Sequence, residues 1–171
     1  NDMITVMRWN SPLREFMMTA GLYLAKAAGE IRLISNDSHV QPELDYHLLD
    51  HPYDLERMRA GVRMQIELGK HDAYRGILKE LKDPLPPDLE SDDSLNQWML
   101  SRASTMHHIS CTARMGTADD PMAVTNQYGQ VHGFEGLRIA DLSIMPDCPR
   151  ANTNSPAMMI GERIADFIKA E

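Results

Sequence analysis

The chain has 171 residues, enough for one ordinary domain or for two partial lobes that another polypeptide completes. Its net charge of −8 and its pI of 5.3 argue against a surface that binds nucleic acid or an anionic membrane, because both partners bind to clustered Lys and Arg. No apolar run approaches the roughly 20 residues of a membrane span, so the sequence predicts a soluble protein, with the cytoplasm slightly favoured.

Strand signals dominate the N-terminal part of the sequence. Residues 3–9 predict a strand from their Ile, Val and Met content, and residues 10–12 (Asn-Ser-Pro) end it. The apolar residues of segment 13–28 suit a helix by periodicity. The assignment of this segment is nevertheless ambiguous.

Helix signals dominate the segment that follows. A first helix is expected to be capped by Asp54 and to end at Gly69. A second should begin near His71 and stop before the proline-rich, linker-like residues 83–87. A third should follow residues 92–94 (Asp-Asp-Ser). The side chains expected to face a core are Leu55, Met58, Val62, Ile66 and Leu68 on the first helix, and Leu95, Trp98 and Met99 on the third.

The remaining elements are predicted to be short. They are a strand that enters His108, a turn at residues 127–129, a strand over residues 137–141, and a helix from Pro156 to Ile168. Pro156 suits the first position of that helix, because its missing N–H would have no intrahelical partner there.

Three sequence blocks in the C-terminal part follow one another in a fixed order. They are H-I-S-C-T-A-R-M-G from His108, V-H-G-F-E-G-L-R-I-A-D-L-S-I-M-P from Val131, and N-T-N-S-P-A-M-M-I-G-E-R-I-A-D-F-I from Asn152. Together, over residues 106–168, they resemble the C-terminal signature of the glucose-methanol-choline (GMC) flavoprotein oxidoreductases. Residues 3–69 resemble the substrate-binding part of that family more loosely.

The resemblance implies that FAD is the cofactor. Members of the family bind FAD through an N-terminal Rossmann unit whose glycine-rich turn holds the pyrophosphate. No Gly-x-Gly-x-x-Gly occurs in this sequence, which opens on Asn1 rather than Met. The expectation is therefore the C-terminal portion of a longer polypeptide, or one of two associated pieces, whose N-terminal FAD-binding segment or chain carries most of the FAD contacts.

The resemblance also implies an α+β fold. Residues 1–100 would form an antiparallel-sheet substrate-binding lobe, and residues 101–171 would return to the FAD-binding domain with the catalytic loops. For residues 13–35 the resemblance favours a hairpin over the helix, with a strand, a turn at residues 27–29 (Ala-Ala-Gly) and a return strand over residues 30–35. Residues 42–46 would then be the short stretch that follows the hairpin in the family.

The activity implied is oxidation of a primary or secondary alcohol, in which a base removes the hydroxyl proton as hydride passes to the flavin. Histidine suits the base because its unperturbed pKa lies near working pH. Counting back from Arg114 places the catalytic histidine of the family on His108 and turns His107 to the other side of the expected strand. The second catalytic position falls on Asn152, whose amide is no base but can hold the substrate oxygen.

Five residues are implied to contact the cofactor. In the family, the N–H groups of the last helix point toward the pyrimidine end of the flavin, which makes Thr153, Asn154 and Pro156 the expected flavin contacts. Ala140 and Asp141 match the family position near the FAD phosphates and ribityl chain. A small-molecule alcohol is the expected substrate, with no nucleic-acid or membrane partner.

Other interpretations of these residues stay open. A lyase or decarboxylase on the same scaffold would keep FAD and His108 without net redox turnover, and a non-catalytic interaction module would need neither. Cys111 and Cys148 are too few for a disulfide scaffold and are expected to be free thiols. With the two histidines they offer zinc-type ligands, but the His-x-x-Cys spacing is weak support and no metal site is predicted. Arg150 is either a solvated loop residue or a cation for an acidic substrate group.

Overall fold

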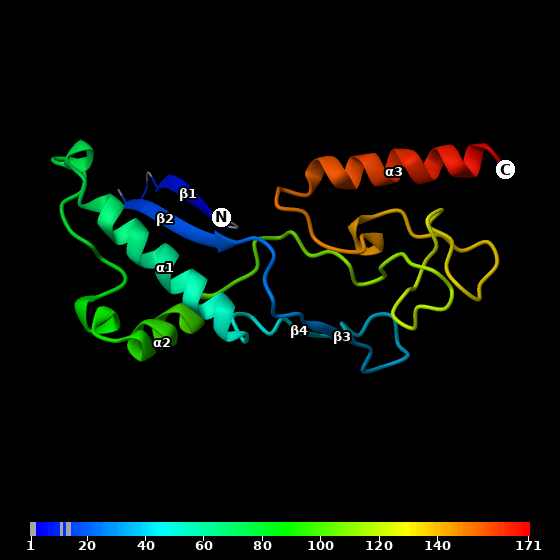
Figure 1. The fold of residues 1–171 in the computed structure, drawn as a ribbon, viewed down its shortest axis with the longest axis horizontal. Coiled ribbons are helices and arrows are strands. Elements are labelled where there is room, and N and C mark those ends of the chain that lie inside the picture. The colour runs from blue at the N-terminus through cyan, green and yellow to red at the C-terminus, as the bar shows by residue number, and fades with distance from the viewer. Residues whose placement is uncertain (1–2, 11, 13–14) are drawn as a thin grey trace. The chain divides into compact units, whose positions relative to one another are not determined.

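The computed structural model describes residues 3–10, 12 and 15–171, and it divides into two compact units, of which the first ends at Ser104 and the second is Thr105–Glu171 (Figure 1). Among the described residues, no helix is both long enough and apolar enough to cross a membrane. The elements of the first unit are β1 Met3–Asn10, β2 Glu15–Leu22, β3 Glu30–Arg32, β4 Glu43–Asp45, α1 Pro52–Gly69, η1 Asp72–Tyr74, η2 Pro86–Leu89 and α2 Asp92–Arg102. The elements of the second unit are η3 Leu142–Ile144 and α3 Asn154–Lys169.

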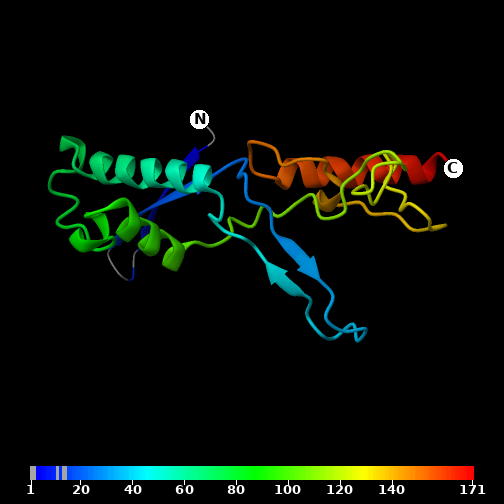
Figure 2. The ribbon, with the colours of Figure 1, turned by 60° about the horizontal axis from the view of Figure 1, so that its bottom comes forward.

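The first two strands form an antiparallel ribbon against which α1 packs (Figure 2). The strand predicted over residues 3–9 is confirmed, and β2 confirms a strand rather than a helix after residue 14. The predicted pairing of that second strand is wrong, because β2 pairs with β1 from Met3↔Leu22 to Asn10↔Glu15. The predicted break at residues 10–12 includes Ser11, which lies outside the described residues.

A second two-stranded sheet joins β3 to β4, in the register Glu30↔Asp45 to Arg32↔Glu43. The expected return strand is therefore shorter than predicted, and its partner is the segment expected to follow the hairpin. The turn predicted at residues 27–29 is wrong. Gly29 instead allows a close backbone approach, since a Cβ there would lie 2.3 Å from the carbonyl oxygen of Asp45.

Helix α1 begins before the predicted cap. Its N-cap is His51, whose side chain accepts a hydrogen bond from the Tyr53 N–H, and the predicted end at Gly69 is confirmed. Asp54 is only 1% exposed, and its carboxylate accepts hydrogen bonds from the backbone N–H groups of Lys26 and Ala27 at 2.7 and 2.9 Å. The capping prediction is wrong because this carboxylate holds the chain after β2 against the helix rather than capping it.

The helix expected after His71 does not form beyond the short turn η1. Gly76, at φ +86°, places the backbone in the left-handed region, where a right-handed helix cannot continue. The third predicted helix is confirmed as α2, which Ser91 caps. Leu95 and Met99 of this helix are buried, and the residues that pack with them include Leu49, Val62, Leu55, Met58, Ile66 and Trp98.

Most of the second unit consists of irregular structure. The turn predicted at residues 127–129 is confirmed, and the Gly129 N–H donates to the Asn126 carbonyl at 3.0 Å. The strand predicted over residues 137–141 is wrong, since only an isolated bridge between Gln130 and Arg138 forms there.

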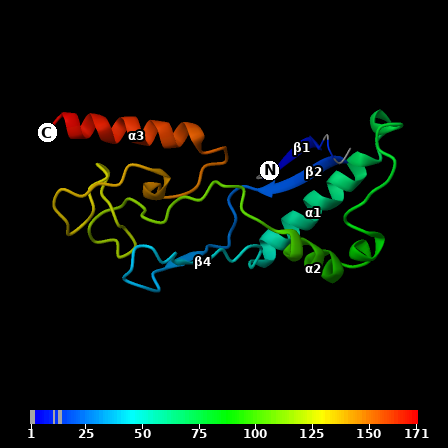
Figure 3. The ribbon, with the colours of Figure 1, turned by 180° about the vertical axis from the view of Figure 1, so that it is seen from behind.

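Helix α3 runs along one side of this unit (Figure 3), and a small apolar core packs it against η3. Its buried members are Ile144, Ile160 and Ile164. The predicted helix is confirmed, but its predicted start at Pro156 is wrong because α3 begins at Asn154. Proline is tolerated throughout the first turn of a helix, where N–H groups have no intrahelical partner, so its presence does not fix the first residue.

Shortening the core side chain Ile144 to valine should lower the stability of the whole protein by about 0.5–1.5 kcal/mol, because a buried methyl group is lost and a small cavity is left. The measurement is the shift of the urea unfolding midpoint. Ile168→Val on α3 is the matched control, since Ile168 is 54% exposed and the change should have little effect. Equal shifts for both variants would contradict the assignment of Ile144 to this core.

Candidate active site

The segment after His108 is held against η3 by backbone hydrogen bonds. The N–H groups of Cys111, Ala113 and Met115 donate at 3.2, 2.9 and 2.8 Å to the carbonyl oxygens of Leu142, Ser143 and Ile144, in that order. Because Ile144 packs on α3 in the core of the unit, these bonds bring the segment after His108 alongside that helix.

His108 and Thr153 meet through their side chains although they are 45 residues apart in sequence. The imidazole Nδ1 lies 2.9 Å from the Thr153 hydroxyl oxygen. Thr153 is only 4% exposed, and His108 is half-buried. In the neutral tautomer whose Nδ1–H donates to the hydroxyl, Nε2 is unprotonated and can accept a proton. The sequence did not predict this pair, although a polar residue just before a helix could have drawn attention to Thr153.

The bond to His108 also changes how α3 begins. Thr153 is the N-cap of this 16-residue helix, a position from which a threonine hydroxyl usually accepts a hydrogen bond from the first turn. In the described structure the hydroxyl makes no such capping bond, because it lies against His108 instead. The first-turn N–H groups of α3, which have no intrahelical partner, therefore remain suited to an outside acceptor of negative charge.

The other residues predicted near the last helix lie close to Thr153 along the chain. Asn152 and Asn154 flank it and are exposed, and Pro156 is half-buried in the first turn of α3. The structure thus brings His108 together with the short run of residues 152–156.

Ala140 and Asp141 lie elsewhere in the second unit, at the start of η3, and both are exposed. The Asp141 carboxylate accepts a hydrogen bond from the Ser143 N–H at 2.7 Å and so caps η3. This capping contact gives Asp141 a structural role that the sequence did not predict.

The prediction of a strand that leads up to His108 is wrong, because the described backbone around this residue is irregular. His107 and Cys111 have φ angles of +62° and +69°, which lie in the left-handed region and interrupt an extended chain on both sides of His108. His107 is exposed, and its N–H donates to the Thr105 hydroxyl at 3.1 Å. The two histidines therefore have different environments, but the reason is not that their side chains point to opposite faces of a strand.

Cys111 and Cys148 lie side by side as free thiols, with 3.7 Å between their sulfur atoms. Burial raises the pKa of the half-buried Cys111 thiol, and Cys148 is exposed. Among the residues that the structure describes, no group of three or more His, Cys, Asp or Glu side chains could hold a metal ion.

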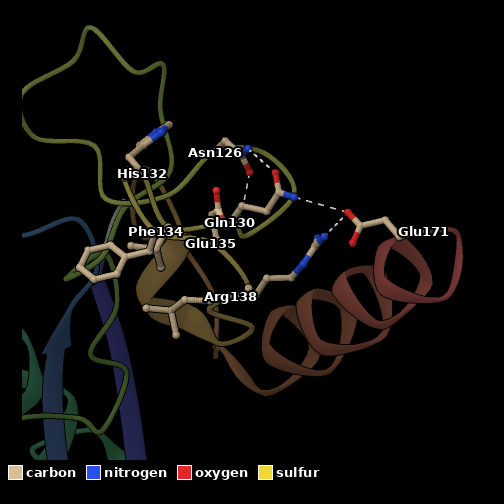
Figure 4. Close-up of a pocket in the computed structure, with 11 residues that line it drawn as sticks. Asn126, Gln130, His132, Phe134, Glu135, Arg138 and Glu171 are labelled. Atoms are coloured by element: carbon tan, nitrogen blue, oxygen red, sulfur yellow. Dashed lines mark hydrogen bonds and ion pairs between the residues drawn. The ribbon is translucent and has the colours of Figure 1, made fainter.

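A pocket of about 420 Å³ lies in the second unit, outside the residues predicted for catalysis (Figure 4). Gln130 links its polar side chains, since it accepts from Asn126 at 2.9 Å and donates to Glu171, which also pairs with Arg138. Phe134 lines the same pocket. The sequence did not predict a site here.

The chain is similar to solved structures and to sequence relatives. A variant of formate oxidase from Aspergillus oryzae RIB40 is similar over 91% of this chain and 27% of that chain, with a TM-score of 0.78 and 28% identity. The oxygen-dependent choline dehydrogenase of Stenotrophomonas maltophilia (strain R551-3) is 36% identical over 90% of this chain. The 5-(hydroxymethyl)furfural oxidase of Methylovorus sp. (strain MP688) is 37% identical over 83% of it.

These relatives are much longer than the chain, which spans 27% of the choline dehydrogenase and 29% of the furfural oxidase. The sequence model of the family described as GMC oxidoreductase matches residues 25–161. The predicted α+β fold of its C-terminal part is confirmed by this match and by the structural similarity. The chain therefore belongs to the GMC oxidoreductase family.

Proposed function

We propose that the whole protein is an FAD-dependent oxidoreductase that oxidises a small alcohol, and that this chain is its C-terminal portion. Relatives named as a choline dehydrogenase and a 5-(hydroxymethyl)furfural oxidase support an alcohol substrate, because both named compounds carry a hydroxyl group. The partner is an N-terminal FAD-binding segment or chain. Residues 1–100 serve as the substrate-binding lobe, and residues 101–171 return to the FAD-binding domain with the catalytic loops.

The bond between His108 and Thr153 is the observation that carries this proposal. A base for alcohol oxidation must present an unprotonated nitrogen in a fixed orientation, within hydrogen-bond reach of the hydroxyl. The buried Thr153 hydroxyl, 2.9 Å from Nδ1, holds the ring in one orientation, and when it accepts a hydrogen bond from Nδ1–H it leaves Nε2 unprotonated. His108 then removes the hydroxyl proton through Nε2.

Asn152 is the proposed anchor for the substrate oxygen. It precedes Thr153 directly, so its backbone joins the residue that orients His108. Its side-chain amide can donate a hydrogen bond to the oxygen as negative charge develops there, a contribution that grows toward the transition state. The role of Asn152 is therefore to position the substrate and stabilise its oxygen, while His108 moves the proton.

The residues at the start of α3 fit a flavin cofactor. Because the Thr153 hydroxyl bonds His108 rather than capping the helix, the first-turn N–H groups suit an anionic acceptor such as the pyrimidine end of a reduced flavin. Thr153, Asn154 and Pro156 would hold this part of FAD by backbone donation and packing, and Ala140 and Asp141 would lie near its phosphates and ribityl chain. When bound, FAD supplies the two-electron acceptor for the hydride.

Anaerobic reduction of the whole protein tests this function. Choline, 5-(hydroxymethyl)furfural and benzyl alcohol are each added to the oxidised protein without oxygen, and the flavin absorbance is followed. At least one alcohol should bleach the flavin and yield the corresponding aldehyde in equal amount. Cleavage of a hydroxylated compound without any bleaching would instead support a lyase or decarboxylase, and a purified protein with no flavin would contradict the proposal.

A further inference from the structure

Three soft or polar side-chain atoms gather in the irregular part of the second unit. The Cys111 and Cys148 sulfur atoms are 3.7 Å apart, and the Ser110 hydroxyl oxygen lies 2.8 Å from the Cys148 sulfur and 3.4 Å from that of Cys111. The two cysteines are 37 residues apart in sequence, so the fold rather than the local sequence brings them together. The function proposed above uses neither thiol.

The two sulfur atoms are in contact but not bonded. A disulfide bond is about 2.05 Å long, so the sulfur atoms need to approach by roughly 1.6 Å, a movement on the scale of small side-chain rotations. The Cys111 backbone is fixed by the hydrogen bond from its N–H to the Leu142 carbonyl, whereas Cys148 lies in an exposed loop without helix or strand structure. The movement therefore falls mainly on the Cys148 side.

We propose that Cys111 and Cys148 form a redox-active dithiol that a hydroperoxide closes to a disulfide. The exposed Cys148 thiolate attacks a peroxide oxygen, which breaks the O–O bond, oxidises the sulfur to a sulfenic acid and releases water or an alcohol. The Cys111 sulfur then attacks the Cys148 sulfur, forms the S–S bond and expels the sulfenic oxygen as a second water. With hydrogen peroxide, two thiols and one peroxide thus give one disulfide and two waters.

The roles of the three side chains follow from their environments. Cys148 is exposed and meets a dissolved peroxide first, while the Ser110 hydroxyl can donate a hydrogen bond to its thiolate. Burial raises the pKa of Cys111, which keeps this thiol protonated and slow toward peroxide until the adjacent sulfenic acid forms. The disulfide would connect the segment that follows His108 with the loop that precedes Thr153, and its formation does not depend on the proposed alcohol oxidation.

Peptide mapping of the whole protein tests the proposal directly. The protein is treated with increasing hydrogen peroxide, its remaining thiols are alkylated, and it is digested with trypsin without reduction. Cleavage at the arginines of this sequence gives peptides 103–114 and 139–150, each with a single cysteine. We expect these two peptides to become joined, with a mass about 2 Da below the sum of the reduced peptides, and to separate again after dithiothreitol.

Two single variants separate the roles of the thiols. In Cys111→Ser, Cys148 should pass beyond the sulfenic acid to the sulfinic acid, because no neighbouring thiol can trap it. In Cys148→Ser, Cys111 should stay reduced at peroxide concentrations that close the wild-type pair. Even if a variant fails to fold, the wild-type digest still shows whether peroxide joins the two cysteines. Sulfinic acid on Cys148 beside an unmodified Cys111, or full alkylation of both cysteines after peroxide, would overturn the proposal.

Discussion

Replacing His108 with alanine should slow flavin reduction by an alcohol about 10²–10⁴-fold, because a positioned general base typically contributes this much to the rate. The loss should appear in the reductive step itself, measured by stopped-flow absorbance of the whole protein under anaerobic conditions. FAD content should stay close to that of the wild type, since the proposed flavin contacts lie on α3 and at the start of η3.

The neighbouring histidine provides the matched control. His107 is exposed, and its φ of +62° is a conformation that asparagine tolerates better than alanine, so His107→Asn changes the side chain with little backbone strain. This variant should reduce its flavin at nearly the wild-type rate. Similar losses for the two histidine variants would mean that the base has been assigned to the wrong residue.

The helices could be predicted from the sequence because their signals are local. Apolar residues repeat with helical spacing along α1 and α2, Gly69 marks the end of α1, and the predicted helix after residue 155 exists as α3. One predicted helix, after His71, does not form, and the other errors lie at the helix ends. Asp54 has the right chemistry for a cap, but its carboxylate bonds the backbone of Lys26 and Ala27. A sequence pattern does not reveal which distant backbone groups compete for a side chain.

Strand pairing and the irregular segments could not be predicted in the same way. For the segment that contains β2, periodicity suggested a helix and only the resemblance to the family favoured a strand. The partner of β2 is set by its contacts with β1 and α1, which its own sequence does not reveal. Around His108 the extended run predicted from the sequence fails because His107 and Cys111 both adopt positive φ. Neither is a glycine, the residue that usually marks such a conformation, so the sequence gives no warning.

At the candidate site, too, the sequence identified residues but did not predict which of them are in contact. The three sequence blocks selected His108 and the run from Asn152, but they did not reveal that a threonine hydroxyl would meet the imidazole. That contact depends on backbone hydrogen bonds between the segment after His108 and η3, and on the packing of Ile144 against α3. Cys111 and Cys148 meet for the same reason, since η3 holds Cys111 and leads into the loop that carries Cys148.

Removing the Thr153 hydroxyl should slow flavin reduction by about 10–10²-fold, because the residue that orients a catalytic imidazole contributes substantially to the rate. Thr153→Val keeps the β-branched shape of this buried side chain and removes only its hydrogen-bonding capacity. The effect should be smaller than that of His108→Ala, since the base is still present but spends less time in the productive orientation. The measurement is again the anaerobic reduction rate at saturating alcohol.

Thr153→Ser distinguishes positioning from a general role in folding. Serine restores the hydroxyl that bonds Nδ1 but not the methyl group, so this variant should recover most of the lost rate even though it leaves a small cavity near the start of α3. If Thr153→Val reduced its flavin as fast as the wild type, the bond to His108 would have no role in the reaction. If instead both variants lost rate and FAD together in proportion, Thr153 would act by holding the start of α3 in place, and the orientation of His108 would have to come from another contact.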